Sequence, residues 1–248
     1  MRLVALLLVT VSICDAYEPT TSRSIVLAAP LATYHNATLQ VYKRLLEDNG
    51  YAVKPIDNVP HKEMYPHFTG ENTSEYVVDI VVSSDLPNNH LRYLDGHFDQ
   101  FEVFGTCYEL LQIFLAVPSY MGISNLTDLA AAAPSINKTI LGFDTLECPV
   151  CPDLTQRWIS ARLPGFSSQP TSKPMLTSLI AEKLQRKERF VATIYAPMFY
   201  GALFPELKRI DMEEFTAEIF NQGKAIIRKD AIGKLDPTTL RRLGAAFI

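Results

Sequence analysis

Short apolar runs alternate with amphipathic segments along most of the chain. Residues 24–29 form the first run, and the apolar positions of residues 37–48 then repeat with a helical period until Asn49 and Gly50. A second apolar run follows at residues 51–56. A strand, a helix and a strand in such a short stretch predict a βαβ unit with parallel strands.

The same alternation continues to the end of the chain. Further strands are predicted at residues 76–82, 112–117, 139–143 and 190–195, and further helices at residues 125–133, 153–161, 173–185, 212–226 and 237–246. This order predicts an α/β fold with mainly parallel sheets flanked by helices. No linker rich in proline, glycine or serine divides the chain, so a chain with two lobes would cross between them inside structured segments.

The longest apolar run lies near the N-terminus and predicts a secretory signal peptide. Residues 3–14 are predominantly apolar, follow Arg2 and precede Ala16, the expected cleavage point. A spanning helix needs about 20 apolar residues, so this run is too short to cross a bilayer, and an uncleaved signal anchor is the alternative. We expect a signal peptide at residues 1–16 and a mature chain, residues 17–248, without a membrane span. The expected location is secreted or, in a bacterium, periplasmic.

The composition excludes several classes of protein. Of the 248 residues, 48% are hydrophobic and 20% are charged, which is ordinary for a globular chain and excludes a wholly disordered one. The formal net charge is −4 and the pI is about 5.8. These values argue against a nucleic-acid partner, because such proteins neutralise phosphates with a surplus of lysine and arginine.

Four Asn-X-Ser/Thr triplets are acceptor sequences for N-linked glycans. They begin at Asn36, Asn72, Asn125 and Asn137. Four is more than chance would give in a chain with so few asparagines. The set therefore indicates a glycosylated eukaryotic secretory protein, and coincidence in a bacterial periplasmic protein is the alternative.

Three cysteines remain after the signal peptide: Cys107, Cys148 and Cys151. The last two form a Cys-X-X-Cys motif before a predicted helix, and we expect a structural disulfide that involves them. Either could instead pair with Cys107, and a redox dithiol or half of a metal site are further alternatives. No second motif with metal-ligand spacing occurs in the sequence, so no metal and no cofactor are expected.

No arrangement of side chains in the sequence indicates catalysis. The five histidines are scattered, and none lies in a GxSxG, HExxH or triad-like context. The only tryptophan, Trp158, lies in a predicted helix and is expected to pack in the core. We therefore expect a protein that is not an enzyme.

Several strings, taken in order, carry a resemblance to a known family. They include the segment from Asp85 to Tyr93 (Asp-Leu-Pro-Asn-Asn-His-Leu-Arg-Tyr), Val117-Pro-Ser-Tyr120, and Tyr195-Ala-Pro-Met-Phe199. Together they resemble motifs of the glycine betaine/choline substrate-binding proteins of ABC transporters. The similarity covers about residues 24–248, and the order of the motifs makes it more specific than any one of them.

This resemblance implies a two-lobe fold like that of the type II periplasmic binding proteins, in which the chain crosses twice between lobes. The first lobe is expected at about residues 24–105 plus 205–248, and the second at about 106–204. In such proteins the ligand lies in the cleft and the lobes close over it.

The resemblance also implies a ligand site, and the departures from the family pattern change its chemistry. Asp85 stands where the family has a tryptophan, and Tyr195 and Phe199 replace two more. Tyr34 falls near the family's first aromatic residue. His90 matches the family's histidine and is expected to brace a turn.

We therefore predict a small quaternary amine or zwitterion held by Tyr34, Tyr195 and Phe199, with Asp85 adding negative charge and His90 beside it. An ABC transporter permease is the expected partner only in a bacterium. The alternatives are a secreted interaction module that keeps the fold without a small ligand, and a thiol oxidoreductase that uses Cys148 and Cys151.

Overall fold

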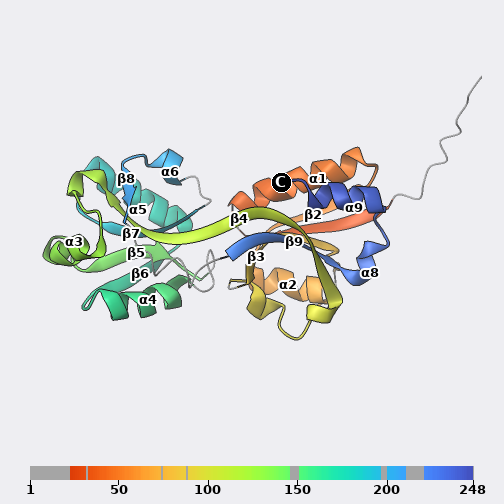
Figure 1. Ribbon diagram of the computed structural model, residues 1–248, viewed down its shortest axis with the longest axis horizontal. Coiled ribbons are helices and arrows are strands. Elements are labelled where there is room, and N and C mark those ends of the chain that lie inside the picture. Colours follow the sequence, from red (N-terminus) through yellow and green to blue (C-terminus); the bar gives the residue numbers. More distant parts are fainter. Residues whose placement is uncertain are drawn as a thin grey trace, which may run out of the picture.

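A computed structural model describes residues 23–31, 33–73, 75–87, 89–145, 151–196, 200–210 and 221–247. Its strands form one continuous path in the order β2-β1-β3-β9-β4-β7-β5-β6, with β8 paired to β4. The path divides into two sheets, each flanked by helices, and these make two lobes that lie side by side in Figure 1.

The first lobe contains both ends of the described chain. Its strands are β1 (Ser24–Pro30), β2 (Ala52–Val59), β3 (Ile80–Pro87) and β9 (Asn221–Arg228), and its helices are α1 (Thr33–Asp48), α2 (His61–Thr69), α8 (Lys229–Ile232) and α9 (Pro237–Gly244). Alternation along β1 decides which face each side chain joins. Ile25 and Leu27 pack with α1 and α9 on one face, whereas Ala28 packs with α2 on the other.

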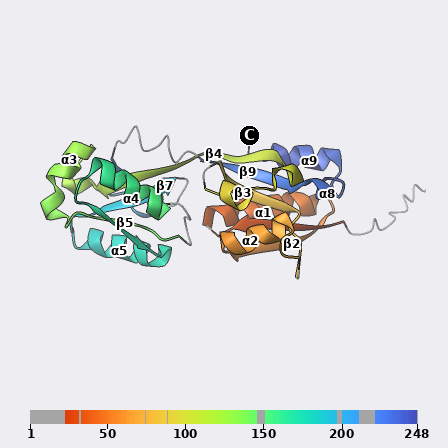
Figure 2. The same ribbon diagram turned by 90° about the horizontal axis from the view of Figure 1, so that it is seen from below.

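The second lobe is built around the parallel strands β5 (Thr139–Phe143), β6 (Ser167–Thr171) and β7 (Val191–Ala196). Its other elements are β8 (Leu207–Arg209), α3 (Leu126–Ala131), α4 (Cys151–Arg162), α5 (Lys173–Gln185) and α6 (Tyr200–Leu203). Figures 1 and 2 both show α4 and α5 on opposite faces of the sheet. Trp158 is buried in this core, as predicted.

One long strand, β4 (Phe101–Pro118), joins the lobes (Figure 2). It pairs with β9 as far as Leu111 and with β7 from Gln112 onward. Because β8 pairs with the last residues of β4, it belongs to the second sheet. We therefore propose that the lobes divide near residue 111 and between residues 210 and 221, rather than at residues 105 and 205.

The sheets are mixed rather than mainly parallel. Strands β1, β2 and β3 run parallel in the first lobe, as do β5, β6 and β7 in the second. Every pairing that involves β4 or β9 is antiparallel, because these strands carry the chain from one lobe to the other and back.

Several parts of the sequence prediction differ from the structure. Strands β6 and β8 were not predicted, and the strand expected at residues 76–82 begins only at Ile80. The helix expected at residues 212–226 is wrong over its last part, because residues 221–226 lie in β9. Ala225, Ile226 and Ile227 are all buried, so this strand is apolar on both faces and lacks the alternation that distinguishes a strand from a helix. Helix α2 was not predicted, and Pro66 inside it weakens its helical signal.

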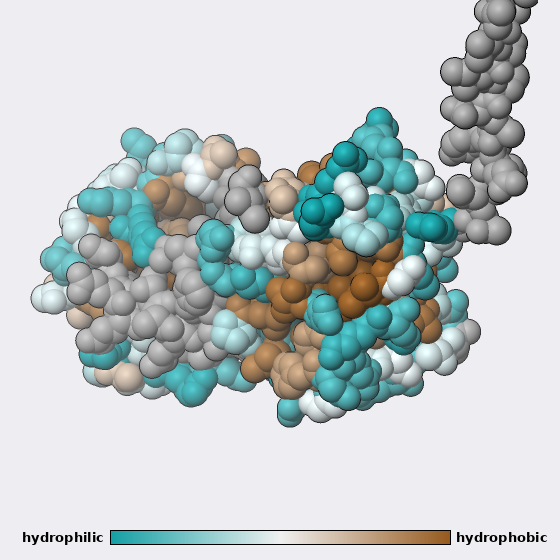
Figure 3. Space-filling view, turned by 45° about the vertical axis from the view of Figure 1, so that its right-hand side comes forward, coloured by the Kyte–Doolittle hydropathy of each residue, from teal (hydrophilic) through white to brown (hydrophobic). Residues whose placement is uncertain are grey.

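The surface of the described residues is mostly polar. Figure 3 shows one hydrophobic area on the face of the first lobe, surrounded by hydrophilic residues. Among the helices in the described ranges, none combines the length and the hydropathy that a membrane crossing requires.

Helix α9 lies so close to β4 that glycine is required at the contact. A methyl group on Gly244 would lie 2.5 Å from the carbonyl oxygen of Phe104, and one on Gly105 would lie 3.1 Å from the Cα of Gly244. We expect Gly244→Ala to lower the free energy of unfolding by about 1–3 kcal/mol, because the helix must move away from the strand. Urea unfolding measures this change.

Gly233, at the end of α8, is the matched control. It has helical φ, and a methyl group there would meet no atom within 4 Å. Gly233→Ala should therefore leave stability unchanged or raise it by up to about 1 kcal/mol. Equal losses in the two variants would contradict the close-contact explanation.

Candidate functional site

The carboxyl ends of the parallel strands in the two lobes face each other. Tyr34, in the first turn of α1, follows β1 and packs against the core of the second lobe. Its ring lies 5.9 Å from that of Tyr195 at the end of β7, and Tyr195 lies 4.8 Å from Phe143 at the end of β5. This is the edge at which open α/β sheets place ligands.

Asp85 lies behind this aromatic contact and is fully buried. Its Oδ2 accepts hydrogen bonds from the Tyr34 hydroxyl and the Asn89 amide, both at 3.2 Å, and its Oδ1 accepts one from the Tyr108 hydroxyl. Asp85 is part of β3 and pairs with Gly223 of β9. The protein itself therefore supplies donors to both carboxylate oxygens.

His90 braces the turn that follows Asp85. The Asp85 N–H donates to His90 Nδ1 at 2.7 Å, and the His90 N–H donates to the Asp85 carbonyl at 2.9 Å. Because Nδ1 accepts, the proton of the neutral ring is on Nε2, which lies 3.8 Å from Asp85 Oδ2. This agrees with the predicted bracing role of His90.

Two more buried histidines complete the cluster, and the sequence did not single them out. His35 Nε2 lies 3.6 Å from Asp85 Oδ2, while its Nδ1 bonds to the Pro30 carbonyl at 3.1 Å. His61 packs its ring 4.6 Å from that of His90. His35 directly follows Tyr34, a predicted site residue, and this adjacency was the one feature of the sequence that could have pointed to His35.

Burial and hydrogen bonding decide the charges in the cluster. Burial by itself would raise the pKa of Asp85, but His35, His90 and the Tyr108 hydroxyl outweigh it and hold that pKa well below its ordinary value. Burial and the negative charge of Asp85 raise the pKa values of both Tyr108 and Tyr34 well above 10. At neutral pH the centre is therefore a carboxylate surrounded by neutral phenols.

A glycine determines how Tyr108 reaches Asp85. The register places Asp85 of β3, Gly223 of β9 and Tyr108 of β4 in one row across the sheet. A methyl group on Gly223 would overlap the Tyr108 ring, so the ring lies directly over the glycine. A glycine inside a strand is the sequence signal for such a close approach.

The two lobes also line a pocket of about 330 Å³ beside His61. Its walls are formed by Pro60, His61, Lys62, Arg92 and Tyr93 of the first lobe and by Thr145 and Asp153 of the second. Arg92 lies over the ring of Tyr93 at 5.0 Å. The inter-lobe space is therefore lined by charged as well as aromatic side chains.

The other predicted site residues are placed as follows. Phe199 and Cys148 lie outside the described residues, and only the backbone of Cys151 is described. Cys107 is a free thiol buried in the core of the first lobe. Within the described ranges, no group of three or more metal-ligating side chains could hold a metal ion.

The comparisons with known proteins identify the family of the chain. Residues 23–231 match the model of a family described as OpuAC, the substrate-binding domain of the ABC-type glycine betaine transport system. The chain belongs to this family. Its members are solute-binding proteins that work with ABC transporters, which agrees with the resemblance seen in the sequence.

Solved structures of OpuAC-like proteins share the two-lobe fold. Lactococcal OpuAC, closed with glycine betaine, is 19% identical over 89% of this chain and 83% of its own, with a TM-score of 0.72. A choline-binding protein in complex with choline is 14% identical over 90% and 78%, with a TM-score of 0.68. ProX of Borrelia burgdorferi is 19% identical over 83% and 75%, with a TM-score of 0.66. No curated protein matches the chain.

The buried histidines predict how stability changes with pH. Burial lowers the pKa of His61 to about 3, whereas an unfolded histidine titrates near 6.5. Between these values the unfolded chain binds more protons than the folded chain, so stability falls as the pH is lowered from 6.5. His61→Gln should reduce this slope by up to about 1.4 kcal/mol per pH unit between pH 4.5 and 6.5.

Urea unfolding at a series of pH values measures the slope. Lys62→Gln is the matched control, because Lys62 is the exposed neighbour of His61 and its replacement leaves the imidazole of His61 in place. Identical slopes in wild type and His61→Gln would show that His61 is not buried as a neutral ring.

Proposed function

We propose that the protein binds a small amine that carries a positive charge, a cation or a zwitterion, between its lobes. The observation that carries this proposal is the Asp85 carboxylate behind Tyr34, whose ring faces Tyr195 of the other lobe. Glycine betaine and choline are bound by two of the solved relatives, and both compounds contain a quaternary ammonium group.

The physical basis is attraction between a cation and the aromatic faces. Quaternary ammonium groups have no N–H donors, so proteins hold them by the negative faces of aromatic rings. The hydroxyl groups of Tyr34 and Tyr108 donate hydrogen bonds to the Asp85 carboxylate, and these bonds increase the electron density of the two rings. Asp85 therefore acts through these tyrosines, without touching the ligand itself.

The position of the rings supports closure of the lobes around the ligand. Tyr34 belongs to the first lobe, whereas Tyr195 and Phe143 belong to the second. A ligand that contacts rings of both lobes stabilises the closed arrangement over the open one. In a bacterium the closed protein would deliver the ligand to an ABC transporter permease.

We further propose that the protein is secreted and glycosylated. The predicted signal peptide at residues 1–16 precedes the described part of the chain. The acceptor asparagines Asn72, Asn125 and Asn137 are exposed, and Asn36 is half-buried on α1. A glycan can be attached only at the surface, and the exposure of these asparagines meets that requirement.

One observation favours a second function, that of an interaction module without a small ligand. Tyr34 already contacts Tyr195, and both oxygens of Asp85 already have donors within the protein. The lobes therefore have an inter-lobe contact that needs no ligand.

Calorimetry with choline and glycine betaine distinguishes the two functions. For wild type we expect binding, and Tyr195→Ala should weaken it by about 1–2 kcal/mol, or about 5- to 30-fold, because one aromatic face is lost. Tyr195→Phe keeps the ring and is the matched control, so its affinity should stay near that of wild type. Absence of binding by correctly folded wild type to either compound would favour the interaction module.

Alkylation of the thiols tests the remaining alternative, an oxidoreductase. With a disulfide between Cys148 and Cys151, denatured and unreduced protein should carry one modified cysteine, the buried Cys107. Mass spectrometry of the alkylated peptides makes this measurement. Three modified cysteines would contradict the structural disulfide and would favour a reduced dithiol.

A further inference from the structure

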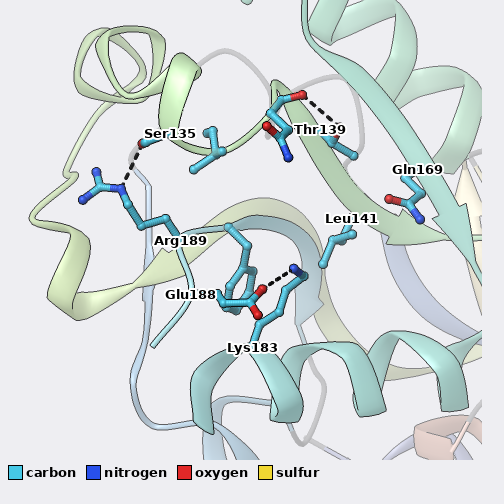
Figure 4. A pocket seen from close by; sticks show the side chains of 10 residues that line it. Ser135, Thr139, Leu141, Gln169, Lys183, Glu188 and Arg189 are labelled. Carbon is cyan, nitrogen blue, oxygen red and sulfur yellow. Dashed lines mark hydrogen bonds and ion pairs between the residues drawn. The ribbon is translucent and has the colours of Figure 1, made fainter. Parts of the chain in front are cut away.

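A second pocket lies in the second lobe, at the end of the sheet opposite the aromatic contact. Strand β5 begins at this pocket with Thr139 and ends at Phe143 beside Tyr195. The pocket has a volume of about 370 Å³ (Figure 4). It is lined by Ser135, Ile136, Asn137, Thr139, Leu141, Gln169, Lys183, Glu188, Arg189 and Phe190.

The walls of this pocket offer hydrogen-bond donors and acceptors around an apolar floor. Lys183 Nζ and Glu188 Oε2 form an ion pair at 2.7 Å, and Arg189 Nε donates to Ser135 Oγ at 2.9 Å (Figure 4). Within the described ranges, the terminal N–H groups of Arg189 have no hydrogen-bond partner in the protein. Leu141, only 5% exposed, contributes to the floor. Such mixed lining suits a sugar, which combines hydroxyl and acetamido groups with an apolar ring face.

Asn137, one of the four acceptor asparagines, is part of this lining. It is exposed and lies in the turn before β5, where Asn137 and Lys138 both have φ of 49°. Its carboxamide makes no hydrogen bond to any described residue. By contrast, the carboxamide of Asn125 caps α3 at 2.9 Å, and that of Asn36 bonds to Gln40 at 3.2 Å.

We propose that the first N-acetylhexosamine of a glycan on Asn137 occupies this pocket. The sugar is attached to the rim of its own site, so its effective concentration there is in the millimolar range or above. Even weak contacts with Arg189, Gln169 and the Lys183–Glu188 pair are then sufficient for occupancy. The glycan becomes part of the packing of the second lobe. This inference rests on the proposed glycosylation, which is measured separately below.

The test uses the full chain from a secretory host that makes only high-mannose glycans. Mass spectrometry of the glycopeptides first determines which asparagines are modified. An endoglycosidase then leaves one sugar on each site, whereas an amidase removes the whole glycan and converts asparagine to aspartate. We expect the one-sugar form to keep the Tm of the intact glycoprotein and the sugar-free form to melt about 2–4 °C lower.

Two controls separate the sugar contact from other effects. Thr127→Ala removes the acceptor sequence at Asn125 but keeps the cap of α3, and it should not change the difference between the two forms. The amidase leaves an aspartate at position 137. The effect of this carboxylate alone is measured by comparing the Tm of unglycosylated protein from a bacterial host with that of its Asn137→Asp variant. Arg189→Ala should lower the Tm of the one-sugar form more than that of the sugar-free form, because the hydrogen bond to Ser135 is lost in both forms but the sugar contact is lost only in the first.

Two results would overturn the proposal. The first is an unmodified Asn137 in protein whose other acceptor sites carry glycans, which leaves the proposed glycosylation intact. The second is a modified Asn137 with equal Tm values for the one-sugar and sugar-free forms, which would show that the sugar extends into solvent.

Discussion

The burial of one carboxylate, that of Asp85, constrains the whole inter-lobe region. An ionised carboxylate without hydrogen-bond partners is too costly to bury, so its oxygens require donors at fixed positions. Two of these donors, Tyr34 of α1 and Tyr108 of β4, come from segments far from Asp85 in the sequence. The third, Asn89, lies in the turn that directly follows β3. Satisfying the carboxylate therefore fixes α1, β3 and β4 relative to one another. The rings that face the second lobe are held by the same hydrogen bonds.

This arrangement depends on the strand that separates the partners. Asp85 and Tyr108 lie on β3 and β4, which are not neighbours, because β9 runs between them. Tyr108 reaches across because Gly223 has no side chain at that point of β9. Strand β9 enters after the return from the second lobe, so the carboxylate is fully enclosed only when the last part of the chain has joined the sheet. Strand β4, which joins the two lobes, therefore also supplies a hydrogen-bond donor to the buried carboxylate of Asp85.

The sequence predicts best those features that are encoded locally. Strand 139–143 and helix 173–185 have the bounds expected from their apolar patterns. Asp85, His90 and Tyr195 were singled out because their segments resemble motifs of the family. Tyr108 and His35 were missed, because their role depends on strand register and on the position of a helix end, which no local pattern records. Strand β9 was read as a helix for a similar reason. It is paired on both sides, to β3 and β4, and a strand that is buried on both faces loses its period of two.

In the proposed binding site, the contact between Tyr34 and Tyr195 would limit which ligand can enter between the lobes. A pair of aromatic rings contributes about 0.5–1.5 kcal/mol beyond its buried area, and a ligand that separates the rings must replace that contribution. A neutral amine of similar size would lose the ring contact and gain only dispersion. A cation gains about 0.5–2 kcal/mol from an aromatic face, and the charge of Asp85 behind the rings acts in the same direction. Under the proposed function, the buried carboxylate would thus turn a contact that excludes most small molecules into one that admits positive charge.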